Sequence, residues 1–519
     1  MEALQAAHFG WLSLLPPIIA IFLALLTKEV LVSLLAGILA GSLFYSGFHP
    51  VKMLETAFSV MGNKMGDNSN ILIFLGLLGA IVVVVTKAGG SQAYGRWASS
   101  KIKSRRAASL ATAGLGCLIF IDDYFNCLTV GTVMRPVTDN VRISREKLAY
   151  LLDAAAAPVC ILAPVSSWGA SVASYMQEAG AGNGMSAFLR TIPFNLYAVC
   201  TIAMLLLVCA VPIGFGPMAR SEKKAAGDGR PPDFPGEVPG SHDLPAVREA
   251  GKVTDLVLPI AVLILSTLLA MLYTGGLFDG KGFFAAIGNT NASLSLVLGG
   301  FSTLLFALLF FLPRKVMKLG EFMEAVADGV KSMVPAYLIL ILAWTIGGIC
   351  DREYLNTGGF IGGLINNSAF PFWLLPALLF VIAGFLGFAT GTSWGTMAIL
   401  IPIGTSVCSS SAQDMLFPVL GAVLAGSVFG DHISPISDTT ILSSAGAGCD
   451  HIRHVSTQLP YATLVAAACL AGFLLSGFLK SAWIPLLLSL FLTLGGAFLL
   501  SHLWNRKYPP GISGRPPRQ

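Results

Sequence analysis

Ionisable and hydroxyl side chains interrupt the apolar runs of this chain, and their types suit the binding of a small hard cation. Residues 427–446, SVFGDHISPISDTTILSSAG, contain Asp431, His432 and Asp438 among several serines and threonines. Pro435 argues against one continuous helix here, because proline removes a backbone donor and clashes with the preceding turn. Carboxylates, hydroxyls and freed backbone carbonyls are oxygen ligands of the kind that hard cations such as Na⁺ prefer.

Four such polar clusters occur, two in each half of the chain. They supply these candidates for ion or substrate binding: Asp122, Asp123, Asn126 and Thr129; Asp153, Ser166 and Ser167; Thr392, Ser393 and Thr396; and Asp431, Ser437, Asp438 and Thr439. Ionisable residues inside a membrane are costly and mark ion or substrate pathways by default. A carboxylate in such surroundings can exchange a proton for a cation. We predict Na⁺ ligands at Asp438, Ser437, Thr439 and Asp123, with His432 as a candidate proton relay.

Each candidate also has a structural alternative. Serine and threonine in membrane spans often bond the carbonyl one turn back or join neighbouring helices. Asp122 or Asp123 could cap the second arm of a helical hairpin. His432 could anchor Asp431 instead of relaying protons. At the level of the sequence these alternatives stay open.

The composition places these residues in a membrane protein. Of the 519 residues 55% are apolar and 11% charged, and the mean hydropathy is +0.75. Apolar stretches of about 18 or more residues, the length of a membrane span, recur along the whole chain. No interleaved basic and aromatic patch indicates nucleic-acid binding. The nine cysteines form no C-x-x-C pair, so we expect them to be small buried hydrophobes.

The positions of lysine and arginine predict the orientation in the membrane. Residues 11–27, 29–46 and 71–86 are predicted spans, with a loop expected between the second and the third. The segment after them, 87–106, carries six basic residues and is therefore expected on the cytoplasmic side. Counting back three crossings puts the N-terminus outside, and the basic tail from Arg506 puts the C-terminus in the cytoplasm. The N-terminus lacks a basic n-region, so the first apolar segment is expected to be a retained span.

The two halves follow the same plan. Residues 108–136 and 373–405 are predicted to form re-entrant hairpins, and each hairpin precedes a span that prolines interrupt. Short matches recur in order at a spacing of roughly 266–271 residues, for example Ala154–Ala157 with Ala422–Ala425. Inverted repeats with paired broken helices are the pattern of a secondary transporter.

We therefore predict an all-α polytopic membrane protein of about 11 transmembrane helices in two inverted-topology repeats, each with a re-entrant hairpin and a broken helix. The predicted divisions are a first repeat at 1–217, a disordered cytoplasmic linker at 218–252, a second repeat at 253–480, and an extra helix with a basic tail at 481–519.

Three motifs resemble characteristic segments of the NhaC family of sodium/proton antiporters. They are FIDDYFNCLTVGTVMRP at 120–136, TGTSWGTMAILIPI at 390–403, and GDHISPISDTTILSSAGAG from Gly430. The resemblance runs in order from about residue 10 to 480. It implies sodium-coupled transport, with Asp438 and the hydroxyls around it matching the family motif. Families of this kind include sodium/proton antiporters and exchangers of organic acids, so the resemblance leaves the solute open.

The leading functional hypothesis is exchange of Na⁺ for H⁺ across a bacterial inner membrane. The alternative is sodium-coupled symport or exchange of a small organic acid or amino acid. No arginine falls in the middle of a predicted span, which favours inorganic ions, whereas half-helix N-termini near Thr129 and Ser166 would suit an anionic group. We expect no enzyme, because metalloprotease and serine-hydrolase motifs are absent. The expected partners are Na⁺, H⁺ and the lipid bilayer, with no cofactor; a homodimer stays open.

Overall fold

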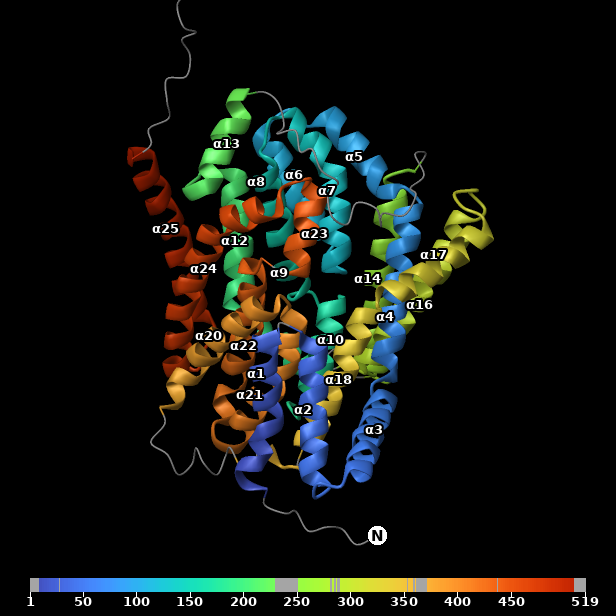
Figure 1. Ribbon diagram of the computed structural model, residues 1–519. Coiled ribbons are helices and arrows are strands. Elements are labelled where there is room, and N and C mark those ends of the chain that lie inside the picture. Colours follow the sequence, from blue (N-terminus) through green and yellow to red (C-terminus); the bar gives the residue numbers. More distant parts are fainter. Residues whose placement is uncertain are drawn as a thin grey trace, which may run out of the picture.

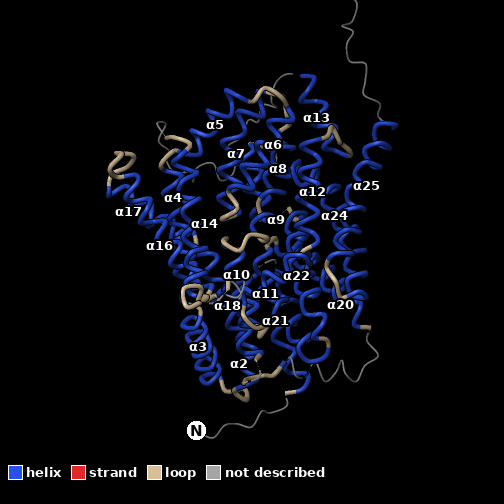
Figure 2. Tube along the Cα trace, turned by 180° about the vertical axis from the view of Figure 1, so that it is seen from behind, coloured by secondary structure: helices blue, strands red, loops and turns tan. Residues whose placement is uncertain are grey.

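The computed structural model describes residues 9–507, apart from 28, 229–250, 281, 284–285, 287–289, 352, 358–359, 361–370 and 436. The described part consists of helices joined by short loops and contains no strand (Figures 1 and 2).

The first half of the chain forms thirteen α-helices among the described residues. They are α1 (Leu15–Thr27), α2 (Val30–Tyr45), α3 (Pro50–Asp67), α4 (Ser69–Lys87), α5 (Gly90–Lys101), α6 (Arg105–Leu118), α7 (Asp123–Asn140), α8 (Arg145–Ala155), α9 (Ala157–Cys160), α10 (Ser167–Glu178), α11 (Gly184–Thr191), α12 (Leu196–Ala210) and α13 (Gly216–Asp228).

The second half continues the bundle after residues 229–250. Its described helices are α14 (Thr254–Thr274), α16 (Ala292–Phe311), α17 (Leu319–Ser332), α18 (Val334–Cys350), α20 (Leu375–Thr390), α21 (Ser393–Ser411), α22 (Leu416–Ile433), α23 (Asp438–Ala447), α24 (His451–Leu479) and α25 (Trp483–Lys507).

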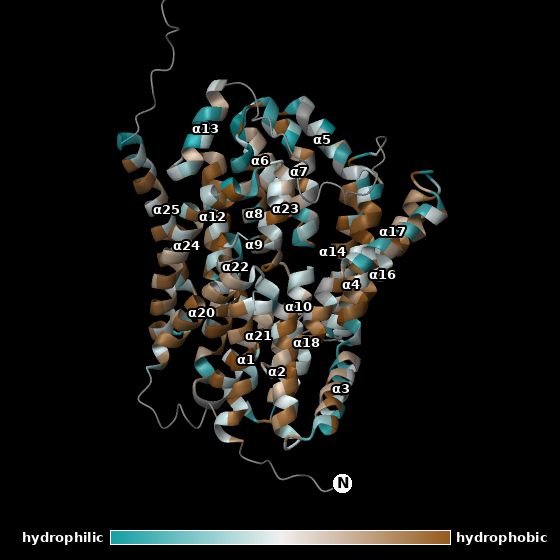
Figure 3. Ribbon diagram, viewed as in Figure 1, coloured by the Kyte–Doolittle hydropathy of each residue, from teal (hydrophilic) through white to brown (hydrophobic). Residues whose placement is uncertain are grey.

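The outer helices have the length and the surface of membrane spans. Among the described residues, seven helices are long and apolar enough to cross a bilayer, or up to nine if two bent helix pairs are counted as spans. Large apolar side chains such as Leu265, Leu309 and Phe491 are exposed on these helices, an arrangement that lipid favours and water does not. Figure 3 shows hydrophobic residues along α14, α16 and α24, with hydrophilic residues on α5 and α13. The predicted all-helical membrane fold is confirmed, whereas the count of 11 spans and the inverted symmetry stay predictions.

Two segments differ from the sequence expectation. The expected loop between the second and third spans contains α3, which starts with Pro50 in its first turn and bends by 119° from α2. Ala57 and Val60, three residues apart, form its buried side. The predicted disordered linker at 218–252 is wrong in its first part, because α13 extends to Asp228. Glu222 on α13 ion-pairs with Arg105 at 2.6 Å, a tertiary contact that composition does not reveal, and the linker residues 229–250 lie outside the described part.

The predicted hairpins and broken spans are present. The pairs α6–α7 and α20–α21 are the hairpins, and Figure 1 places them toward opposite ends of the bundle. Gly391, with φ +68°, makes the turn of the second hairpin, a backbone conformation that favours glycine. The breaks are residues 161–166 between α9 and α10 and residues 434–437 between α22 and α23. All four helices that follow a break or a hairpin turn (α7, α10, α21 and α23) begin inside the bundle with buried residues.

Close glycine contacts fix α23 against α7. A side-chain carbon on Gly446 would lie 2.5 Å from the carbonyl oxygen of Cys127, and one on Gly131 would lie 2.6 Å from the Gly446 backbone. Both contacts are to backbone atoms, which cannot rotate away. The two helices therefore pack with their backbones in direct contact, as small residues permit in membrane bundles.

We expect Gly446→Ala to destabilise the protein by roughly 1–3 kcal/mol, because the methyl group forces α23 away from α7. The matched control is Gly114→Ala in α6, where an added carbon meets nothing within 4 Å. That control should be neutral or stabilise by about 0.5–1 kcal/mol. Thermal unfolding of the purified protein in detergent measures both variants, and an unchanged midpoint for Gly446→Ala would contradict the close packing.

Candidate functional site

The first hairpin tip and the first broken span bind each other directly. Ser167, the first residue of α10, donates its hydroxyl to Asp122 Oδ2 at 3.1 Å. Its backbone N–H donates to the carbonyl oxygen of Ile121 at 2.9 Å. The start of α10 is therefore hydrogen-bonded to the hairpin tip. The fold brings the predicted site residues Asp122 and Ser167 together.

The second hairpin tip also contacts its broken span through a serine and an aspartate, but here the hairpin carries the serine. Ser393, the first residue of α21, donates to Asp431 Oδ2 at 2.8 Å and to the carbonyl oxygen of Ser427 at 3.1 Å. Here the hairpin supplies the hydroxyl, and α22 supplies the carboxylate just before its break. Asp431 and Ser393 are thus a second predicted pair that the fold joins.

Two tryptophans connect these two pairs. Trp168 follows Ser167 on α10, and Trp394 follows Ser393 on α21. Their rings lie 5.1 Å apart at 52°, and both are buried. The N-termini of α10 and α21, although they belong to different halves of the chain, therefore meet at this aromatic contact.

Asp123 is the least satisfied carboxylate of the site. Its side chain is 1% exposed, and neither oxygen has a hydrogen-bond partner among the described residues. The indole of Trp168 lies near it but outside hydrogen-bonding geometry. The carboxylates of Asp122 and Asp431 both act on it electrostatically. Three acidic side chains therefore face one small region of the interior.

Asn126 lies one turn after Asp123 on α7 and joins three elements. Its Nδ2 donates to the carbonyl oxygens of Gly116, Ile119 and Ala155 at 2.7, 3.0 and 3.2 Å. These bonds tie α7 to the end of α6 and to the end of α8. The Oδ1 atom of Asn126 has no hydrogen-bond partner among the described residues. Consecutive turns of α7 thus present an unpaired carboxylate and an unpaired amide oxygen, both suited to a hard cation.

Several predicted hydroxyls have local structural bonds. Ser166 caps α10 by accepting from the backbone N–H of Gly169 at 2.9 Å, and Ser437 caps α23 by accepting from that of Thr440 at 3.2 Å. Ser437 also lies 3.1 Å from the Thr439 hydroxyl. Thr396 donates to the carbonyl oxygen one turn back, at 3.0 Å. These bonds match the structural alternatives and leave the predicted ion-binding roles untested.

The other predicted residues lie close to the same tips. Thr129 is buried on α7, and Thr392 immediately precedes α21. Asp438 is the first residue of α23, but its side chain lies outside the described part of the structure.

A second polar cluster surrounds Asp153 on α8. Its Oδ2 accepts from Gln458 Nε2 at 2.6 Å and from the Thr440 hydroxyl at 3.2 Å, and His454 Nε2 lies 3.4 Å away. Gln458 also donates to the carbonyl oxygen of His432 at 2.7 Å, and His432 Nδ1 lies 3.2 Å from the hydroxyl of Tyr197. Asp153 and His432 are therefore brought together, through a glutamine that the sequence analysis did not consider.

Sequence reasoning missed His454 and Gln458. Neither residue belongs to the polar clusters or the three motifs that the sequence analysis singled out. The available signal was their spacing of four residues, which puts both on the same side of α24. Both side chains are buried.

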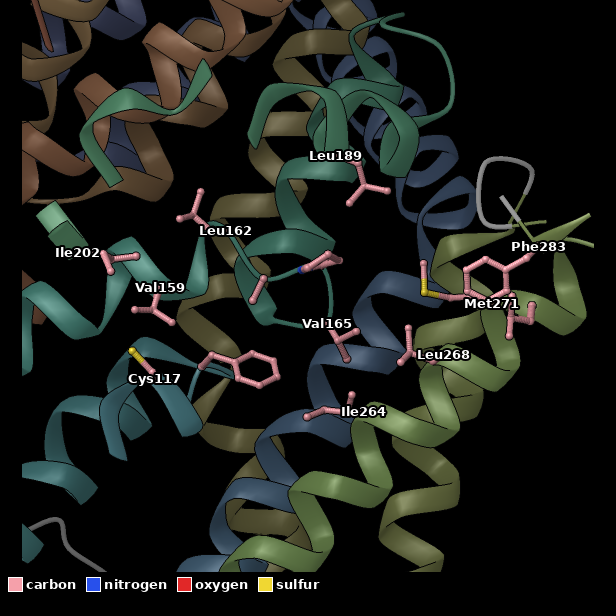
Figure 4. Close-up of a pocket in the computed structure, with 14 residues that line it drawn as sticks. Cys117, Val159, Leu162, Val165, Leu189, Ile202, Ile264, Leu268, Met271 and Phe283 are labelled. Atoms are coloured by element: carbon pink, nitrogen blue, oxygen red, sulfur yellow. The ribbon is translucent and has the colours of Figure 1, made fainter. Parts of the chain in front are cut away.

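An apolar cavity of about 650 Å³ lies beside the first break (Figure 4). Leu162, Pro164 and Val165 of the break line it on one side, and Ile264 and Met271 of α14 line it on another. Among the described residues its lining includes no charged side chain, so it suits an apolar group rather than an ion. The ion-binding candidates lie outside this cavity.

Comparison with known proteins agrees with this arrangement. A model of the Na⁺/H⁺ antiporter family matches residues 159–478. An uncharacterised protein of Haemophilus influenzae is 40% identical over 503 residues, which cover 93% of each chain. A malate-2H⁺/Na⁺-lactate antiporter of Bacillus subtilis is 31% identical over 150 residues, covering 27% of this chain and 29% of the relative.

A solved structure shares the fold. The YdaH transporter of Alcanivorax borkumensis superimposes with a TM-score of 0.53 at 14% sequence identity, covering 85% of this chain and 89% of the other. The resemblance to NhaC-type antiporters that the three motifs indicated is confirmed by the family match. The chain belongs to the Na⁺/H⁺ antiporter family.

Proposed function

We propose that this secondary transporter exchanges Na⁺ for H⁺ across the bacterial inner membrane by alternating access. The observation that carries the proposal is the Asp123 carboxylate, buried and without a hydrogen-bond partner among the described residues. An ionised carboxylate in such a place is costly, so a proton or a metal cation must neutralise it. A proton and a sodium ion compete for the same oxygens, and this competition is the basis of exchange.

The proposed sodium site lies on α7 and reaches toward α23. Asp123 and the Oδ1 atom of Asn126 supply oxygens from α7, and Ser437, Asp438 and Thr439 supply oxygens from the first turn of α23. In support, α23 packs directly against α7. The N-cap geometry of Ser437 leaves its hydroxyl at the end of the helix, beside the break.

Alternating access has a structural basis in the two tip contacts. The bond from Ser167 to Asp122 closes one hairpin on its broken span, and the bond from Ser393 to Asp431 closes the other. Since the hairpins lie toward opposite ends of the bundle (Figure 1), separating one contact at a time would open the centre to one side at a time.

The distribution of basic residues supports the orientation with the C-terminus in the cytoplasm. Lysines and arginines concentrate on α5, at the start of α6 and on α13, which Figure 1 shows at the end of the bundle opposite the start of α1. The positive-inside rule assigns that end to the cytoplasm.

We expect Asp123→Asn to lower Na⁺-driven proton flux in proteoliposomes by at least about thirtyfold, because loss of a buried charge contact costs about 2–5 kcal/mol. The assay imposes a pH gradient and adds Na⁺ without organic solute. The matched control is Asp139→Asn on the same helix, where the partly exposed carboxylate lies 3.5 Å from Arg145 and an exposed ion pair contributes little. Normal flux in Asp123→Asn would remove this carboxylate from the site.

We further expect Asp438→Asn to abolish transport while the protein stays folded, since asparagine can keep the helix start but not the charge. Isotopic Na⁺ uptake together with size-exclusion behaviour in detergent separates the two effects. If Na⁺ dependence is unchanged in this variant, the coupling carboxylate must be sought among Asp122, Asp123 and Asp153.

A second candidate function, exchange of a small organic acid or amino acid with Na⁺, rests on the helix N-termini. The starts of α7 and α10 meet at Ser167, and those of α10 and α21 meet at the tryptophans. Helix N-termini attract anionic groups such as carboxylates. The relative named as a malate-2H⁺/Na⁺-lactate antiporter makes organic acids the first solutes to test. If wild-type liposomes fail with Na⁺ alone and respond when malate, lactate or an amino acid is added, this second function replaces the first.

A further inference from the structure

We propose that one exchanged proton is bound by the His454–Asp153 pair, at a site separate from Asp123. This inference rests on the proposed Na⁺/H⁺ exchange and adds to it the residues that hold a proton. Four helices build the cluster: Asp153 comes from α8, His432 from α22, Thr440 from α23, and His454 with Gln458 from α24. The side chains of Asp153 and His454 are both 0% exposed.

The hydrogen bonds of the cluster leave one clear place for a proton. Thr440 and Gln458 both donate to Oδ2 of Asp153, so the carboxylate is held in its charged form. The nearest titratable atom is His454 Nε2, 3.4 Å from that oxygen and not in hydrogen-bonding geometry. With a neutral imidazole the pair carries one negative charge. A proton on His454 makes the pair an ion pair with no net charge, so binding and release of one proton balances the charge without any covalent step.

Unsatisfied polar atoms support a proton-binding cluster rather than a purely structural one. Among the described residues, four side chains of the cluster have buried atoms without a hydrogen-bond partner: Asp153 Oδ1, both ring nitrogens of His454, His432 Nε2 and Gln458 Oε1. Buried polar groups are normally bonded, and groups left unsatisfied mark places for water or for protons. A cluster that only stabilised the fold would be expected to satisfy these atoms internally.

Other ionisable groups surround the pair. His432 acts on Asp153 electrostatically, and its Nδ1 lies 3.2 Å from the Tyr197 hydroxyl. Tyr150, Tyr197 and Cys127 also face Asp153 and are neutral groups at physiological pH. Arg453, the residue before His454, ion-pairs with Glu146 at 2.7 Å. His454 lies 3.4 Å from the Asp153 carboxylate, so a proton on it neutralises the pair directly.

The pair lies close in sequence to partly exposed residues and has a hydrogen-bonded link to the proposed sodium site. His454 lies in the first turn of α24, whose residues His451 and Arg453 are partly exposed. On the other side, Asn126 of α7 donates to the carbonyl oxygen of Ala155, two residues after Asp153. A shift of α7 on sodium binding would thus move the end of the helix that carries Asp153.

The ratio of protons to sodium ions tests the proposal. In proteoliposomes with a clamped membrane potential, the Na⁺ gradient that just balances a fixed pH gradient reports this ratio. We expect the ratio to fall by one in both His454→Gln and Asp153→Asn. The matched control is His451→Gln, one turn earlier on α24, whose ring bonds Ser444 and Pro435 outside the cluster; its ratio should equal that of the wild type. A loss of rate alone, as from a looser fold, does not move a balance point.

Each outcome has a distinct meaning. An unchanged ratio of protons to sodium ions in either active variant overturns the inference. Loss of Na⁺/Na⁺ exchange in two folded variants also overturns it, because the cluster would then belong to the sodium site. Variants that keep Na⁺/Na⁺ exchange but move no protons support it. A wild-type protein without Na⁺-driven proton flux would instead contradict the proposed exchange.

Discussion

A broken membrane helix leaves backbone and side-chain groups that lipid cannot satisfy, and this constraint organises the centre of the protein. The gaps at residues 161–166 and 434–437 must find partners inside the bundle. The hairpin tips provide them: Ser167 bonds the tip at Ile121 and Asp122, and Ser393 of the other tip bonds α22 at Ser427 and Asp431. Polar residues are therefore concentrated at the breaks because the fold requires partners there, and the same residues become available to an ion.

Each of the two tip contacts joins a serine hydroxyl to an aspartate carboxylate, but the hairpin and the broken span exchange these two side chains. In the first, the hairpin carries the acid and the broken span carries the hydroxyl; in the second, the broken span carries the acid. Both acids, Asp122 and Asp431, act electrostatically on Asp123. Three carboxylates that interact electrostatically concentrate negative potential, and such a potential favours cations, in support of the proposed substrate.

Local signals were sufficient to predict the breaks and the hairpins. Pro158, Pro164 and Pro435 indicate where a helical span is interrupted. Acidic residues inside apolar runs indicate candidate functional sites. The parts that were missed depend on tertiary contacts. Helix α13 is held by Glu222 against residues far away in the chain. His454 was missed because nothing in its own segment shows that Asp153, about three hundred residues earlier, lies against it.

The two buried carboxylates Asp153 and Asp123 have different hydrogen-bonding surroundings. Asp153 is bonded by an amide and a hydroxyl and lies beside the imidazole of His454, so hydrogen-bond donors stabilise its negative charge. Among the described residues Asp123 has no such donor, so in the proposed exchange a bound cation or its own proton neutralises it. Titratable groups with such different environments can take different roles in one mechanism. In the proposed exchange a sodium ion and a proton compete at Asp123, and the His454–Asp153 pair holds a further proton. Asn126 of α7, which donates to the carbonyl oxygen of Ala155, links the two places.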